Sequence, residues 1–180
     1  MKVVSIVGMA GAGKSVVARV FEGAGFKKVR FGDVTEQEVK KRGLAINEEN
    51  ERLVREQLRE QYGMAAYAIL NQPHIDSLLL SSDVVVDGLY SWEEYILFKD
   101  KYGSNFIVIA VWASPRTRYS RLASRKVRPL TFEEAASRDK SEIENVKKGG
   151  PIAMADFTIL NETSIVELEN DTRRILARIK

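Results

Sequence analysis

A short glycine-rich segment near the N-terminus constrains the fold of this chain more than any other feature of its sequence. The segment from Gly8 to Ser15 reads G-M-A-G-A-G-K-S and fits the pattern G-x-x-x-x-G-K-[ST]. It follows the apolar run 2–7, which predicts a buried strand, and precedes a helix predicted over residues 14–24. A strand, a glycine loop and a helix in this order predict a phosphate-binding loop, and they argue against a chance match on a glycine-rich turn.

Each residue type in this loop has a physical role. Residues without large side chains let successive backbone N–H groups point into a hollow of anion size, and the following helix adds its positive end. We expect Lys14 to reach the β- and γ-phosphates of ATP, and the hydroxyl of Ser15 to bind Mg²⁺. The predicted nucleotide contacts in this segment are Gly8, Gly11, Ala12, Gly13, Lys14, Ser15 and Val16.

The rest of the chain alternates predicted strands with predicted helices. Apolar, β-branched runs at 29–31, 84–86, 106–111 and 157–160 predict four more buried strands. The helical patterns comprise a helix ending near residue 43, a long amphipathic helix over 47–69, a fresh start at Pro73, a first-turn proline at Pro115, and capping boxes at 91–94, 131–134 and 164–167. The order predicts one α/β domain over residues 1–180, with a five-stranded parallel sheet flanked by helices.

The composition excludes several functional classes. The 180 residues include no cysteine, which rules out disulfides, thiolate metal sites and thiol nucleophiles. Lys and Arg total 28 against 25 for Asp and Glu, and a net charge of +3 is too small to require a nucleic-acid partner. The first apolar run is too short for a signal-peptide core or a membrane span. We therefore expect a cytoplasmic protein without nucleic-acid or membrane partners, and the oligomeric state stays open.

Three further segments lie at or near predicted strand ends, namely F-G-D-V at 31–34, D-G-L-Y-S at 87–91 and I-A-M-A-D-F-T-I-L-N at 152–161. They resemble, in turn, the glycine-aspartate pair and the D-G-F-P-R-T segment of adenylate kinases, and the A-D-x-V-I-x-N stretch of dephospho-CoA kinases. The chain thus resembles the P-loop small-molecule kinases nearly end to end, most closely the archaeal adenylate-kinase-related proteins. The resemblance implies a P-loop NTPase fold, ATP and Mg²⁺ as cofactors, and a small nucleotide-like acceptor.

The resemblance also implies roles for three polar residues. Asp33 corresponds to an aspartate that is the presumed base in dephospho-CoA kinases, although an aspartate here is equally suited to cap the next helix. Asp87 would hold Mg²⁺ directly or through water, with a turn aspartate before glycine as the alternative. Asn161 lies where the resembling kinases pass by the adenine, and a plain turn asparagine is the alternative.

The densest basic region begins after Pro115. In the resembling kinases this region is a lid whose arginines fold over the triphosphate and neutralise charge during transfer. We expect a short lid over about residues 125–138, with Arg125 and Arg138 in catalysis and Arg121 at ATP. A solvated basic helix is the alternative. The basic residues of this region are Arg116, Arg118, Arg121, Arg125, Lys126, Arg128 and Arg138.

One departure from the adenylate kinase pattern concerns the acceptor. The two arginines that grip the acceptor phosphate are replaced by Glu36 and by Tyr90-Ser91, so a cation elsewhere in the acceptor region 32–70 must substitute, or the acceptor is not a simple nucleoside monophosphate. We expect an ATP-dependent kinase acting on an AMP-like nucleoside monophosphate, with the ribose hydroxyl of dephospho-CoA as the alternative acceptor. A nucleotide-binding switch or regulator is the alternative from another class. The candidate substitutes are Lys40, Lys41, Arg42 and Arg59.

Overall fold

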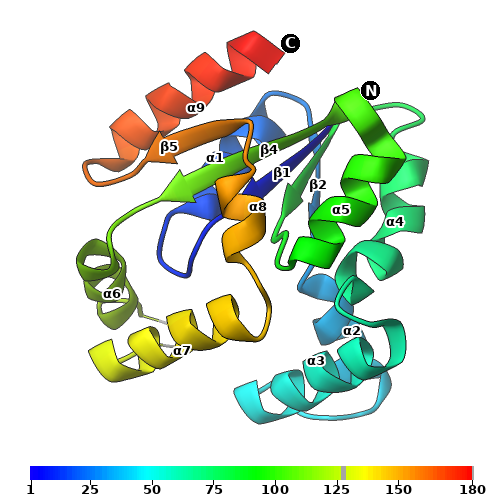
Figure 1. The fold of residues 1–180 in the computed structure, drawn as a ribbon, viewed down its shortest axis with the longest axis vertical. Coiled ribbons are helices and arrows are strands. Elements are labelled where there is room, and N and C mark those ends of the chain that lie inside the picture. The colour runs from blue at the N-terminus through cyan, green and yellow to red at the C-terminus, as the bar shows by residue number, and fades with distance from the viewer. Residues whose placement is uncertain (127–128, 180) are drawn as a thin grey trace.

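The computed structural model describes residues 1–126 and 129–179, and in it a parallel sheet lies between two layers of helices (Figure 1). The strand order is β2-β3-β1-β4-β5, which confirms the predicted five-stranded parallel sheet. The chain order reverses at β1, and ligands of open α/β sheets bind at such a point, outside the carboxyl ends of the strands. The strands are β1 (Val3–Val7), β2 (Lys27–Arg30), β3 (Val84–Asp87), β4 (Phe106–Trp112) and β5 (Phe157–Leu160).

The helices fall into three groups around the sheet (Figure 1). Helices α1 and α9 cover one face, and α4, α5 and α8 cover the other. Beyond the carboxyl ends of the strands, α2 and α3 lie on one side and α6 and α7 on the other, with the phosphate loop between them. The helices are α1 (Lys14–Gly23), α2 (Asp33–Lys41), α3 (Glu48–Tyr62), α4 (Ala66–Leu78), α5 (Trp92–Tyr102), α6 (Pro115–Ala123), α7 (Phe132–Glu144), α8 (Gly149–Ala153) and α9 (Ile165–Ile179).

The two faces of the sheet form two hydrophobic cores. On the face under α4 and α5, the rings of Phe31, Phe98 and Phe106 pack edge to face, with centroids 5.7 Å apart in both contacts. On the face under α1 and α9, Phe21 and Phe26 meet at 5.1 Å. Aromatic pairs at these separations stabilise a core beyond their buried area. Because Phe31 comes directly after β2, the first core also fixes the start of the segment 32–70, which was predicted to bind the acceptor.

The predicted start signals of several helices are confirmed. Capping boxes with both reciprocal hydrogen bonds open α5 at Ser91 and α7 at Thr131. The same pair of bonds joins Ser164 and Glu167 at the start of α9, and Pro115 is the first residue of α6. Within residues 1–126 and 129–179, no helix has the length and apolar character needed to cross a bilayer.

Two helix predictions were wrong. The amphipathic pattern over 47–69 spans two helices, because Gly63 with φ 73° ends α3 and the chain restarts as α4 at Ala66. The apolar spacing continues across this short break, so periodicity alone does not reveal it. Pro73 lies inside α4 rather than at a helix start. The buried side chains of Tyr67 and Ile75, on either side of the proline, hold the helix together against the cost of about 3 kcal/mol for an interior proline.

A buried ion pair joins the phosphate loop to the helices beyond the sheet. The guanidinium of Arg118 on α6 makes two bonds to the carboxylate of Asp139 on α7, of 2.9 and 2.5 Å. The same group donates to the carbonyl of Ala10 at 3.2 Å and to that of Ala113 at 3.0 Å. The side chains of Arg118 and Asp139 are only 5% and 11% exposed. Arg118 therefore has a structural role, and its position on the basic face of α6 does not make it a lid arginine.

We predict that Asp139→Leu lowers the free energy of unfolding by about 3–5 kcal/mol, because it leaves a buried guanidinium without its counter-ion. The double variant Arg118→Met/Asp139→Leu should be more stable than the single variant, since it removes both buried charges. Urea unfolding followed by far-UV circular dichroism measures both. A double variant as unstable as the single one, or less stable, would contradict this assignment.

Candidate functional site

The phosphate loop occupies the turn between β1 and α1, and its glycines are required by close contacts. Gly8 and Gly13 have φ values of 149° and 107°, which side-chain-bearing residues rarely adopt. A Cβ at Gly8 would lie 2.3 Å from the carbonyl oxygen of Val111, and one at Gly13 would lie 2.4 Å from Nδ2 of Asn161. Gly11 lies in the same way against the backbone of α6. The loop is therefore packed tightly against its neighbours on three sides.

Asn161 ties the end of this loop to the last strand. Its Nδ2 donates to the carbonyl of Ala12 at 2.8 Å, and its own backbone N–H donates to Trp112 at 2.7 Å. Its Oδ1 accepts from Arg121 of α6 at 3.4 Å, and NH1 of that guanidinium is buried and has no hydrogen-bond partner among the described residues. The structure thus brings together Ala12, Arg121 and Asn161, three of the predicted nucleotide contacts.

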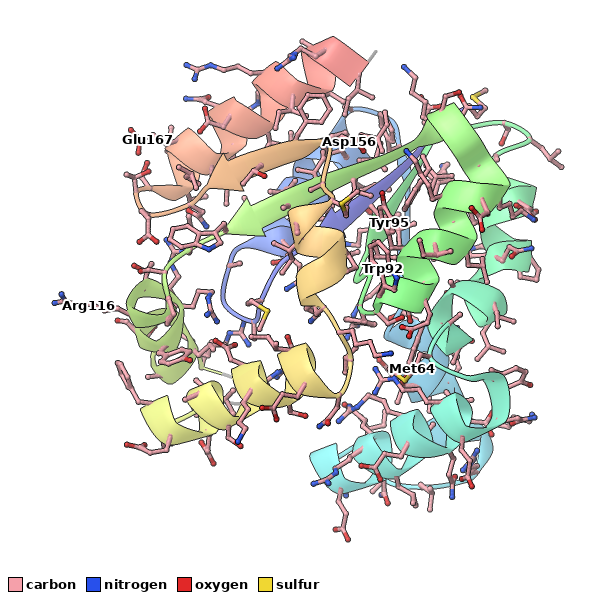
Figure 2. All side chains as sticks on the ribbon, viewed as in Figure 1. Met64, Trp92, Tyr95, Arg116, Asp156 and Glu167 are labelled. Atoms are coloured by element: carbon pink, nitrogen blue, oxygen red, sulfur yellow. The ribbon has the colours of Figure 1, made fainter. Side chains whose placement is uncertain are left out.

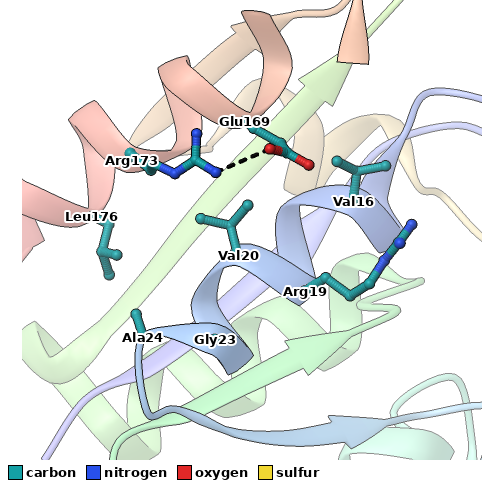
Figure 3. A pocket seen from close by; sticks show the side chains of 8 residues that line it. All are labelled: Val16, Arg19, Val20, Gly23, Ala24, Glu169, Arg173 and Leu176. Carbon is teal, nitrogen blue, oxygen red and sulfur yellow. Dashed lines mark hydrogen bonds and ion pairs between the residues drawn. The ribbon is translucent and has the colours of Figure 1, made fainter. Parts of the chain in front are cut away.

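Val16 differs from the other predicted contacts of the loop. Its side chain faces a groove of about 440 Å³ between α1 and α9 (Figure 3). Its backbone N–H donates to Gly13 at 3.0 Å. Only the backbone of Val16 is therefore on the phosphate side. The groove lies along the outer face of α1, and its lining includes the exposed ion pair of Glu169 and Arg173 at 2.9 Å.

Lys14 crosses the loop at the point where the strand order reverses. Its Nζ donates to the carbonyls of Gly8 at 2.9 Å and of Met9 at 3.1 Å. Burial lowers the pKa of Lys14 to about 7. The charges of Lys148 and Arg138 lower this pKa further, while Glu142 and Asp87 oppose the shift. Side chains from β3, from α7 and from the segment after α7 therefore act electrostatically on one ammonium group. The groups that surround Lys14 are Lys148, Glu142, Asp87 and Arg138.

Ser15 and Asp87 are the two residues predicted to bind Mg²⁺. Ser15 is exposed in the first turn of α1, and Asp87 ends β3, where it is the register neighbour of Ile6 in β1. Hydroxyl and carboxylate oxygens suit Mg²⁺, which usually takes one or two protein ligands together with substrate phosphates. In the part of the chain that the structure describes, no three His, Cys, Asp or Glu side chains gather as a metal site. The residues therefore fit an ion that is bound together with nucleotide.

The predicted lid arginines divide by environment. Arg138 on α7 pairs with Glu142 at 3.1 Å, and its charge reaches Lys14. Burial and the charge of Arg138 lower the pKa of Arg125, so these two predicted catalytic arginines lie within electrostatic reach of each other. Arg116 points away from the molecule (Figure 2). Arg128 lies outside the described residues, as does part of the segment predicted to be the lid.

Asp33 does not cap the helix that follows it. The N-cap of α2 is Gly32, and Asp33 is the first helical residue and makes no capping hydrogen bond. Its carboxylate lies 3.2 Å from the guanidinium of Arg30 and is about half exposed. Its negative charge stabilises α2, because it lies at the positive end of the helix dipole. The role of Asp33 as a base stays a prediction.

Of the four cations suggested as substitutes for the missing acceptor arginines, Arg59 has the most suitable environment. The three on or next to α2 are engaged in surface ion pairs with glutamates one turn away. The guanidinium of Arg59, on α3, lies 5.6 Å from the centre of the Tyr67 ring. Its Nε is buried and has no hydrogen-bond partner in the described structure. A buried donor without a partner is costly, and a ligand anion would satisfy it.

Two further buried ionisable residues were not predicted from the sequence as site residues. Lys148 is 3% exposed and donates to Glu142 at 2.6 Å. Glu94, in the first turn of α5, is fully buried and accepts the backbone N–H groups of Tyr90 and Ser91 at 2.7 and 3.1 Å. Burial raises the pKa of Glu94 to about 7. The sequence signal for Glu94 is the capping box that it forms with Ser91. For Lys148 the only sequence signal is the double glycine that follows it, which indicates a turn.

The fold and the phosphate loop define a P-loop nucleotide-binding protein, and comparison with known proteins agrees. Residues 4–146 match the AAA domain family. The UPF0200 protein of Thermococcus kodakarensis is 37% identical over 181 residues, covering 98% of this chain and 97% of that protein. The UPF0200 protein of Hyperthermus butylicus is 34% identical over 182 residues, covering 98% and 94%. The chain therefore belongs to the AAA domain family and is a relative of the UPF0200 proteins over nearly its whole length.

Solved kinases share the fold. A shikimate kinase from Bacteroides thetaiotaomicron superposes with a TM-score of 0.62 and 13% identity, covering 98% of each chain. A dephospho-CoA kinase from Campylobacter jejuni superposes with a TM-score of 0.57 and 14% identity, covering 99% of this chain and 97% of that one. These likenesses confirm the predicted P-loop kinase fold.

We predict that nucleotide binding above pH 7 is coupled to proton uptake by Lys14. In the protein without nucleotide, the ammonium of Lys14 has a pKa of about 7. Phosphate anions beside it raise that pKa, so above pH 7 the nucleotide complex holds a proton that the protein without nucleotide has lost. Affinity for ATP should therefore fall as the pH rises above 7, by up to about tenfold per pH unit. Calorimetric titration in buffers of different ionisation enthalpy counts the protons.

The control for this prediction is Lys14→Arg, because an arginine stays charged throughout this pH range. The variant should lose the proton uptake attributed to Lys14. Equal uptake by the variant and the wild-type protein would show that another group takes up the proton.

Proposed function

We propose that the protein is an ATP-dependent phosphotransferase that moves the γ-phosphoryl group of ATP to a small nucleotide-type acceptor, with an AMP-like nucleoside monophosphate favoured. The observation that carries this proposal is the convergence of charged groups at Lys14. Asp87 from β3 and Arg138 from α7 both act on this lysine at the mouth of the phosphate loop. The fold shared with a shikimate kinase and a dephospho-CoA kinase supports the same class.

On the donor side, the backbone N–H groups of residues 11–16 would hold the phosphates at the start of α1, where Gly13 provides no side-chain cap. Lys14 would leave the loop carbonyls and contact the β- and γ-phosphates. Ser15 and Asp87 would hold Mg²⁺, which neutralises charge on the phosphate oxygens when bound. Arg121 and Asn161 would lie on the adenine side.

In the transfer step, the bond between the γ-phosphorus and its bridging oxygen breaks as a new bond forms to an acceptor oxygen, and ADP leaves. Arg125 and Arg138 would neutralise the group in transit. An acceptor that presents a hydroxyl also loses a proton, and Asp33 would take it. An acceptor phosphate is already ionised and needs no such base. Catalysis would then depend on positioning and charge neutralisation.

Dephospho-CoA is the second candidate acceptor. The segment 152–161 and the likeness to a solved dephospho-CoA kinase favour it. Its ribose hydroxyl would need a base, so it requires Asp33 to reach the site from its present ion pair with Arg30. A nucleoside monophosphate has no such requirement, and Arg59 with its unpartnered Nε suits an acceptor phosphate.

The test of this function incubates the protein with ATP, Mg²⁺ and a panel of acceptors, and follows both ADP release and the mass of each acceptor. The panel comprises nucleoside monophosphates, dephospho-CoA, shikimate and gluconate. A gain of one phosphoryl group by an acceptor supports the proposal and identifies the substrate. Slow ADP release that no acceptor accelerates would instead support a nucleotide-dependent switch.

We predict that Lys14→Ala lowers phosphoryl transfer by at least about 100-fold, because it removes the cation nearest the transferring group. The fold should be retained, since the side-chain hydrogen bonds of Lys14 within the described residues go to carbonyls of its own loop. Arg116→Ala is the matched control, because that side chain points into solvent, and it should transfer at the wild-type rate. Near-normal turnover by a folded Lys14→Ala protein would overturn the mechanism.

We also predict that Asp87→Asn raises the Mg²⁺ concentration needed for half-maximal activity by about tenfold or more, because an amide binds Mg²⁺ less strongly than a carboxylate does. Asp100→Asn, at an exposed position of α5, is the control. Activity measured against free Mg²⁺ at saturating ATP reports the change. An unaltered Mg²⁺ dependence in Asp87→Asn would assign this carboxylate to turn formation alone.

A further inference from the structure

Lys148 is a buried lysine held at the edge of the phosphate loop by the segment that joins α7 to α8. The preceding residue, Lys147, has φ 55°, which turns the chain sharply. Gly150 then packs so closely on Trp92 that a Cβ would lie 2.6 Å from the indole ring. These constraints direct Lys148 inward, where its ammonium pairs with Glu142 at 2.6 Å. Burying a lysine to 3% exposure is costly, and such positions usually serve a purpose.

The charges around Lys148 favour the binding of an anion in this region. The charge of Lys148 lowers the pKa of Lys14 more than any other charge does, so the two ammonium groups are within electrostatic reach and repel each other. Arg138 adds a third positive charge, against the carboxylates of Glu142 and Asp87. An ammonium carries three donors, of which Glu142 engages one. Anionic ligands beside the two lysines would relieve their repulsion, and the one beside Lys148 would use its remaining donors.

The ammonium of Lys148 also borders a cluster of aromatic rings. Its Nζ lies 5.1 Å from the centre of the Tyr90 ring. Tyr90 meets Tyr67 edge to face at 5.7 Å, and Phe31 contacts both rings. Arg59 lies over the ring of Tyr67 with a buried, unpartnered Nε. Two cations therefore border one aromatic cluster, an arrangement that suits a ligand with an anionic group.

We propose that Lys148 binds an anionic group of the acceptor, on the side of the site bordered by Tyr90 and Arg59, and thereby restricts acceptors to compounds that carry a phosphate or carboxylate. Glu142 is the counter-ion that holds the ammonium in place before the acceptor arrives. This inference rests on the proposed phosphotransferase function and assigns its acceptor side. Lys14 and Lys148 then have separate ligands, the first the donor phosphates and the second the acceptor.

The test measures the KM of the acceptor and the KM of ATP separately in Lys148→Met. We expect the acceptor KM to rise about 10- to 100-fold, the size of a lost hydrogen bond to a charged group, while the KM of ATP stays within about threefold. Lys148→Arg should recover part of the acceptor affinity. Lys147→Met is the matched control, because that side chain is 61% exposed and pairs with Glu93 on the surface, and it should leave both constants unchanged.

Two comparisons with the wild-type protein complete the test. Phosphate-bearing and carboxylate-bearing acceptors in the panel tell which anion the site takes, and an uncharged nucleoside should bind at least about tenfold more weakly than its monophosphate. This comparison needs no variant, so it shows whether the acceptor must carry an anionic group even if Lys148→Met does not fold. In that case Lys148→Gln supplies a second neutral side chain at this position.

Three results would overturn the inference. The first is an acceptor KM that is the same in Lys148→Met and in the wild-type protein. The second is an equal rise in the KM of ATP, which would assign Lys148 to the donor side. The third is an uncharged nucleoside that binds as well as its monophosphate. Failure of the wild-type protein to phosphorylate any acceptor is a different result, because it rejects the proposed function itself.

Discussion

The contact between the phosphate loop and the backbone of its neighbours determines the rest of this structure. Gly8 lies against the carbonyl of Val111, Gly11 against α6, and Gly13 against the amide of Asn161, so each glycine meets a different element. Arg118 reinforces the same contact by binding Ala10 and the partner carboxylate on α7. A loop fixed in this way has its N–H groups oriented before any ligand arrives, and preorganised donors cost no rearrangement when charge develops.

Most of the fold could be predicted from the sequence because local signals and the global topology agree. The G-x-x-x-x-G-K-S pattern specifies a strand, a loop and a helix together, and the capping boxes specify helix starts through two reciprocal hydrogen bonds. The break at Gly63 and the interior Pro73 could not be predicted, because burial of Tyr67 and Ile75 outweighs the local preference of proline. Tertiary packing also decided which arginines face the loop, since Arg118 and Arg121 have the same helical spacing signal but different partners.

The charged residues of the site come from distant parts of the chain, and this explains why sequence motifs find only some of them. Lys14 and Asp87 lie in recognisable motifs at strand ends. Lys148 does not, because its location depends on a sharp turn at Lys147 and on the packing of Gly150 against Trp92. Periodicity assigns such a lysine to the surface by default. Its burial beside Glu142 follows only from the way α7 and α8 are joined over the carboxyl ends of the strands.

The short break between α3 and α4 does not separate the two helices, because both belong to one core. Residues 63–65 join the end of α3 to the start of α4, and Gly63 has φ 73°. Val54 and Leu58 of α3 are buried in the same cluster as the inward side chains of α4. Arg59 follows directly after Leu58, so this packing also fixes the backbone that carries its guanidinium. For an acceptor that contacts both Arg59 and Lys148, as proposed, the core itself then sets the span between the two cations, and with it the size of acceptor that they admit.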